Sequence, residues 1–169
     1  MILIEAVVLF LIFFVLWEKM ILNLKIKFII EMTSNGLITN TNIIVDNFSF
    51  AKKFQPQKFI HFLSHFHSDH YWGLTTSWSF GPLFCSDVTR TLLLNKFPNV
   101  PNVIALKLNL THEIWLNESQ TKFVKVTLLK ANHIPGSVMF LFQGYFGNIL
   151  HTGDIRYYKG MGLRILNVF

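Results

Sequence analysis

The chain has a single cysteine, Cys85, among its 169 residues. One cysteine excludes an internal disulfide and fits a reducing compartment. Charged residues are also scarce, at 14%, whereas hydrophobic residues reach 51%. A chain of this length can form one domain with its own core, so we expect a single domain.

The sequence also lacks an uncharged run long enough to cross a bilayer. Residues 6–17 carry no charge, but these 12 residues fall short of the roughly 20 that a membrane helix needs. A signal peptide is disfavoured because Glu5 stands where basic residues are expected and no small-residue cleavage site follows. Residues 1–31 are therefore a membrane anchor, a targeting leader, or sequence upstream of the true start. We prefer the last, since Met32 opens a polar segment, and we expect a domain at 32–161 and a divergent tail at 162–169.

Acidic residues are fewer than basic ones, and the imbalance belongs to one part of the chain. The whole sequence has 15 Lys and Arg against nine Asp and Glu, and residues 1–31 contain three of each sign. Residues 32–169 therefore hold 12 basic and six acidic side chains, which accounts for the entire net charge of +6. A basic surface favours a polyanionic partner such as nucleic acid.

What the sequence does have is a cluster of histidines after an apolar run. The pattern H-x-H-x-D-H, formed by His65, His67, Asp69 and His70, follows residues 59–63 in the sequence. Side chains two apart in an extended segment point the same way, so His65 and His67 can converge on one ion. Asp69 and His70 can take a second ion beside it. Imidazole and carboxylate suit zinc, with bonds of about 2.0–2.2 Å, and a solvated histidine-rich turn is the weaker interpretation.

The periodicity of the rest predicts a layered α/β (α+β) fold. The segment 59–63 is apolar on both faces, which indicates a strand covered on both faces. Further strands are expected at 43–45, 82–85, 103–108 and 122–129, with a hairpin of 137–142 and 148–152 and a short helix at 70–74. Ser86 is a plausible N-cap of a helix that runs to about residue 96. Its core-facing side is expected to carry Val88, Leu92, Leu93 and Phe97.

Three of these strands end just before a candidate ligand. His65 follows the strand at 59–63, His133 follows the strand at 122–129, and Asp154 follows the hairpin. Sites in layered α/β folds gather where strand ends meet loops. We therefore expect His65, His67, His133 and Asp154 to surround one point.

The motifs that hold these residues resemble a known family. Residues 62–74 (FLSHFHSDHYWGL) and 126–156 (VTLLKANHIPGSVMFLFQGYFGNILHTGDIR) are similar to segments of the metallo-β-lactamase-fold DNA crosslink repair nucleases of the β-CASP group. The resemblance covers about 32–161. It implies the N-terminal part of an αββα sandwich, with the β-CASP insert and the second half of the fold absent.

The resemblance also implies a site and a role. His65, His67 and His133 would hold one zinc ion, Asp69 and His70 a second, and Asp154 would bridge them, while Asp46 would orient the histidine loop. The implied activity is a 5′-to-3′ exonuclease on DNA 5′ ends that are single-stranded or damaged. The implied setting is the nucleus, in crosslink repair, double-strand break repair and telomere maintenance, with telomere-associated proteins as partners.

Metal-assisted phosphodiester hydrolysis would need few other catalytic groups. Lys52, Lys53, Lys58 and Arg156 could hold the phosphate backbone, although a solvated surface charge is the favoured interpretation of each. The chain departs from the family pattern D-A-N-H-C-P-G at two positions, which hold Lys130 and Ile134. A lysine three residues from His133 could repel a metal ion or pair with a phosphate.

Two alternatives remain beside the exonuclease. The same histidine motif serves small-molecule hydrolases of the glyoxalase or lactamase kind, but the segment around His133 and the basic balance favour DNA. The third interpretation is a truncated product without activity that binds zinc or DNA weakly. Because half of the sandwich and one further family histidine would be missing, we expect the 169-residue chain alone to have little or no nuclease activity.

Overall fold

The computed structural model of this chain describes residues 36–49 and 59–162. The leader at 1–31, the residues Lys52, Lys53 and Lys58, and all of the tail except residue 162 lie outside the described residues. Among the described residues, no helix is long and apolar enough to cross a membrane. Residues 36–49 and 59–157 belong to one compact unit.

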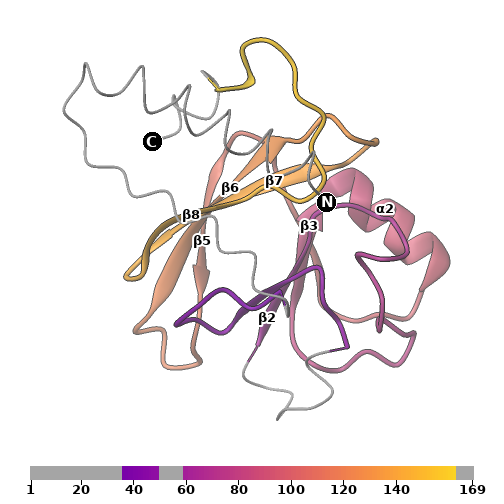
Figure 1. Cartoon of the computed structure of the whole chain (residues 1–169). Coiled ribbons are helices and arrows are strands. Elements are labelled where there is room, and N and C mark those ends of the chain that lie inside the picture. Colours follow the sequence, from indigo (N-terminus) through magenta and orange to yellow (C-terminus); the bar gives the residue numbers. More distant parts are fainter. Residues whose placement is uncertain (1–35, 50–58, 163–169) are drawn as a thin grey trace. The chain divides into compact units, whose positions relative to one another are not determined.

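Two four-stranded sheets form this unit (Figure 1). The first sheet is entirely parallel, and the second is an antiparallel meander. The parallel sheet contains, in spatial order, β1 (Ile43–Val45), β2 (Ile60–Leu63), β3 (Leu83–Ser86) and β4 (Val103–Leu106). The antiparallel sheet contains β5 (Thr111–Trp115), β6 (Phe123–Lys130), β7 (Val138–Gly144) and β8 (Gly147–His151). The helix α2 (Asp87–Lys96) connects β3 to β4.

The parallel sheet is covered on both faces, as the apolar strand predicted. Phe62 belongs to the core between the two sheets, where its ring lies 5.2 Å from that of Phe140 and 4.9 Å from that of Phe142. The next residue, Leu63, belongs to a second core that includes Leu93 of α2. Because neighbouring side chains of a strand point to opposite faces, β2 contributes to both cores. This double burial fixes the strand from which the histidine loop leaves.

The helix confirms the predicted N-cap and part of the predicted buried side. Ser86 caps α2 by accepting a hydrogen bond from the backbone N–H of Thr89. Leu93 is buried as expected, but Val88 and Leu92, which were also expected in the core, are exposed, and Thr89 is buried. The hydroxyls of Ser86 and Thr89 both donate to the carbonyl of Gly136, at 2.7 and 3.2 Å. These bonds fix the rotation of the first turn and direct Thr89 inward.

Two further expectations about the elements were wrong. Residues 70–74 form turns rather than a short helix. Gly73 has a φ of +93°, and a Cβ there would lie 2.5 Å from the backbone nitrogen of Ser49, so the chain passes too close for a regular helix. The strand β5 was not expected, because Ile114 is its one buried residue and provides little apolar pattern. Pairing with β6 creates this strand.

Candidate metal centre

Three chain segments meet where β2, β6 and β8 end. The backbone N–H of Val138 donates to the carbonyl of Ser64, which joins the start of β7 to the histidine loop. The backbone N–H of Arg156 donates to the carbonyl of Ala131 at 2.9 Å, and the Asn132 amide donates to the carbonyl of Arg156. These bonds hold the segment after β8 beside the segment after β6. Histidines and an aspartate from distant parts of the chain are thereby brought to one place.

Four side chains at this place could hold a metal ion: His65, His67, His133 and Asp154. One ligand atom from each lies within 4.8 Å of the other three. His67 Nδ1 is 3.0 Å from His65 Nε2 and 3.3 Å from His133 Nε2. Asp154 Oδ2 is 3.5 Å from His133 Nε2 and 3.8 Å from His65 Nε2.

These separations fit a tetrahedral zinc site. Bonds of about 2.0–2.1 Å in tetrahedral geometry place neighbouring ligand atoms about 3.4 Å apart. Four of the six separations between the ligand atoms, from 3.0 to 3.8 Å, lie around that value, and all six are within 4.8 Å. His65 is fully buried, whereas 46% of the Asp154 side chain is exposed, so the cluster is open to solvent on the Asp154 side. An open side leaves room for water or a substrate.

His70 and Asp69 lie outside the four-residue cluster but next to it. His70 Nε2 is 3.5 Å from Asp154 Oδ1 and 3.8 Å from Asp69 Oδ2. Asp154 thus directs one carboxylate oxygen at His65 and His133 and the other at His70. Asp69 is largely exposed. Among the described residues, the group of side chains that could hold a metal ion includes neither His70 nor Asp69.

Asp46 lies behind the histidines. Its Oδ1 accepts a hydrogen bond from the backbone N–H of Ser64 at 2.7 Å, and its Oδ2 accepts from the Ser64 hydroxyl at 2.6 Å. His70 Nδ1 also lies 2.8 Å from Asp46 Oδ2. Because the Ser64 hydroxyl donates its proton to Asp46, it can only accept a hydrogen bond from His65 Nδ1, which lies 2.9 Å away. The proton of His65 therefore sits on Nδ1, and the lone pair of Nε2 faces the cluster.

The electrostatics keep His65 neutral. Burial, together with the nearby His70 and His67, lowers the pKa of His65 to about 4, and Asp46 and Asp154 only partly oppose the shift. For His70, burial is the largest single influence and lowers its pKa. The hydrogen bond to Asp46 and the charges of Asp46, Asp154 and Asp69 outweigh burial, so the pKa of His70 is raised overall. A neutral His65 can donate its lone pair to a metal at neutral pH.

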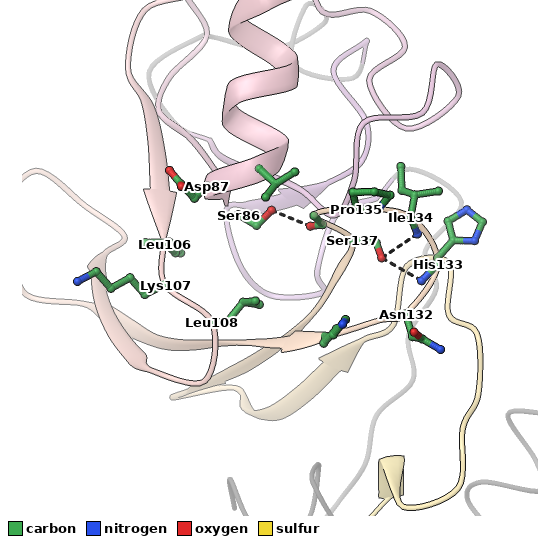
Figure 2. Close-up of a pocket in the computed structure, with 13 residues that line it drawn as sticks. Ser86, Asp87, Leu106, Lys107, Leu108, Asn132, His133, Ile134, Pro135 and Ser137 are labelled. Carbon is green, nitrogen blue, oxygen red and sulfur yellow. Dashed lines mark hydrogen bonds between the residues drawn. The ribbon is translucent and has the colours of Figure 1, made fainter.

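Ser137 holds His133 in place. Its Oγ accepts hydrogen bonds from the backbone N–H groups of His133 and Ile134, at 3.0 and 3.1 Å (Figure 2). Asn132, with a φ of +61°, makes the sharp turn that precedes them. The bonds fold residues 133–136 into a compact loop. Ser137 and Ser64 are supporting residues that the sequence did not single out, because a serine beside a ligand has no distinctive pattern.

The remaining predicted residues lie around the cluster. Arg156 is exposed and joins the site through its backbone. Lys130 is exposed at the end of β6, and Ile134 lies in the His133 loop. Both positions depart from the family pattern, yet the loop still presents His133 to His67.

No family model matches the chain. Individual proteins do match it, and the similarity covers most of the chain. It is 45% identical over 129 residues to "5′ exonuclease Apollo" of Rattus norvegicus, which is 75% of this chain and 23% of that protein. It is 46% identical over 101 residues to "DNA cross-link repair protein pso2/snm1" of Schizosaccharomyces pombe, covering 57% of this chain and 17% of the relative.

The human "DNA cross-link repair 1A protein" is 48% identical over 97 residues, which is 57% of this chain and 9% of that protein. The chain spans about a quarter of the length of the Apollo relatives it matches. At this identity, extending over three quarters of its length, the chain is homologous to part of the proteins named 5′ exonuclease Apollo, and it is also similar to part of the DNA cross-link repair proteins.

Proposed function

We propose that this site serves zinc-dependent hydrolysis of phosphodiester bonds in DNA, from the 5′ end towards the 3′ end. The observation that carries the proposal is the meeting of His65, His67, His133 and Asp154 at separations that suit tetrahedral zinc. The names of the relatives, a 5′ exonuclease and cross-link repair proteins, support DNA as the substrate. The excess of basic side chains in residues 32–169 favours the same polyanion.

In this proposal, His65, His67 and His133 hold the first zinc ion, Asp69 and His70 hold the second, and Asp154 contacts both. The chemistry that zinc supplies in such sites is activation of a water molecule and neutralisation of charge on the phosphate. Asp46 has a positioning role, through Ser64 to His65 and directly to His70.

The chain's own residues arrange the reactants. The exposed side of Asp154 is the face from which DNA enters, because His65 is buried behind it. Ser137 keeps the backbone of His133 rigid, which limits movement of the ligand during a reaction. A preorganised site avoids the cost of ordering its groups when the substrate binds.

The proposal includes a fold and a cellular setting. The proposed fold is part of a metallo-β-lactamase αββα sandwich, to which the parallel layer, the antiparallel layer and α2 would belong. The setting is repair of crosslinked or broken DNA and processing of telomere ends in the nucleus. It rests on the sequence resemblance and, for crosslink repair, on the names of the relatives.

The test uses single-stranded DNA with a 5′ phosphate and a label at the 3′ end. We expect zinc-dependent binding of this DNA, and any shortening should begin at the 5′ end and require zinc. His67→Ala should abolish the zinc-dependent part of the binding. The control is Ser77→Ala, because Ser77 is exposed and is not a member of the four-residue cluster. A zinc-loaded protein that binds DNA no better than His67→Ala would contradict the proposal.

A further inference from the structure

A cavity of about 670 Å³ opens beside His133. Four segments line it: the start of α2, the end of β4 with the residues that follow, the end of β6, and the loop 132–137 (Figure 2). Its volume falls within the range of about 300–1,000 Å³ that is typical of small-ligand sites. His133 belongs both to the cavity lining and to the metal cluster, so the cavity adjoins the candidate metal centre.

The lining of the cavity combines apolar side chains with cations. Leu106, Leu108, Val88 and Ile134 provide the apolar part. Leu108 and Val88 are 44% and 46% exposed, and together they give the cavity an apolar surface that a ligand can cover. Apolar side chains at this place could pack against the face of a nucleobase.

The cationic side chains are Lys107 and Lys130, which come from different segments and line the same cavity. The one acidic residue in the lining is Asp87, so the formal charges of Lys107, Lys130 and Asp87 sum to +1. Two ammonium groups can contact the phosphates that flank a base. Asn132 adds an amide oxygen, since its amide nitrogen already donates to the carbonyl of Arg156.

We infer that this cavity is a nucleotide subsite, which holds one base of the DNA strand against Leu106 and Leu108 and its phosphates against Lys107 and Lys130. The inference rests on the proposed function, because it places the subsite along the strand whose phosphodiester lies at His133.

The first experiment removes the two cations. Lys107→Gln and Lys130→Gln are combined, and the control combines Lys122→Gln with Lys125→Gln, which removes the same charge near the opposite end of β6. Binding of a 5′-phosphorylated thymidine hexamer is measured by fluorescence anisotropy in zinc-containing buffer at several salt concentrations. Zinc content and circular dichroism establish that each variant is folded and keeps its metal.

For the cavity variant we expect affinity to fall by about three- to thirtyfold, because exposed ion pairs contribute up to about 1 kcal/mol each. The slope of log affinity against log salt should also shrink by about 1.4, which is about 0.7 for each single-strand phosphate that no longer has a lysine partner. In the control variant, the affinity for the hexamer and the salt slope should change only by the small amount that follows from the lower net charge of the protein. Equal reductions in the two variants would overturn the subsite.

A second experiment needs no variant. In protein with labelled Leu methyl groups, the hexamer should shift the signals of Leu106 and Leu108, while inorganic phosphate alone should leave them in place. Zinc-dependent binding of the hexamer that shifts neither Leu signal would overturn the subsite and leave the proposed function standing. Absence of any zinc-dependent DNA binding by the unmodified chain would overturn both together.

Discussion

Replacing Ser64 by alanine tests whether the residues behind the histidines prepare them for metal. The Ser64 hydroxyl donates to Asp46 and accepts the Nδ1 proton of His65. After the change, Asp46 keeps the backbone N–H of residue 64 and His70 as partners. His65 keeps none for its Nδ1 proton, and its ring is fully buried. The substitution therefore acts mainly on His65.

His65 then has two unfavourable choices. It can leave Nδ1–H buried and unpaired, which costs about 1–3 kcal/mol. It can instead move the proton to Nε2, which removes the lone pair that faces His67. Either choice weakens metal binding by about five- to 150-fold, since about 1.4 kcal/mol corresponds to a factor of ten. Removing a hydrogen bond behind a metal ligand typically costs about 10- to 100-fold in affinity.

The assay is a zinc titration against a fluorescent chelator of known affinity. Ser77→Ala is the control, because Ser77 is exposed and its hydroxyl bonds to that of Thr75 rather than to a histidine. Circular dichroism before the titration separates weaker binding from unfolding. A folded Ser64→Ala protein that binds zinc as tightly as the unmodified chain would refute the reasoning about the His65 proton.

Three further changes should have measurable effects. Burial lowers the pKa of His61 to about 4, so the unfolded chain binds more protons than the folded chain between pH 6.5 and 4. His61 should therefore lower the free energy of unfolding by about 3 kcal/mol as the pH drops through this window. Urea unfolding at several pH values should show a smaller fall in His61→Leu, and an equal fall would contradict this role of His61. Zinc at 100 times its dissociation constant should stabilise the fold by about 2.7 kcal/mol, and a chelator should reverse the gain in melting temperature. Ser137→Ala should weaken zinc binding because the backbone N–H groups of His133 and Ile134 lose their acceptor, and an unchanged affinity would exclude a positioning role for Ser137.

The parts of the fold that the sequence predicts are those with strong local patterns. The strand β2 is apolar on both faces and proved to be buried on both, and Ser86 caps α2 as its position before a helical pattern indicated. The H-x-H spacing at His65 and His67 depends on the alternation of an extended chain, which is a local property. Such features need no knowledge of the rest of the molecule.

The parts that the sequence did not predict depend on distant contacts. The strand β5 forms because it pairs with β6, and its own residues give little apolar pattern. The exposure of Val88 follows from hydrogen bonds to Gly136, which lies 48 residues later in the chain. Ser64 was overlooked for a related reason, because its role requires Asp46 to lie beside it. Local propensity carries no information about contacts of this kind.

The central claim is that His65, His67, His133 and Asp154 hold a divalent metal ion. The most direct test is elemental analysis of purified, folded protein by mass spectrometry, with the His67→Ala, His133→Ala double variant purified in parallel. The account predicts at least one equivalent of zinc in the unmodified chain and a large reduction in the variant. A folded protein without stoichiometric metal, or a variant that keeps the full amount, would contradict it.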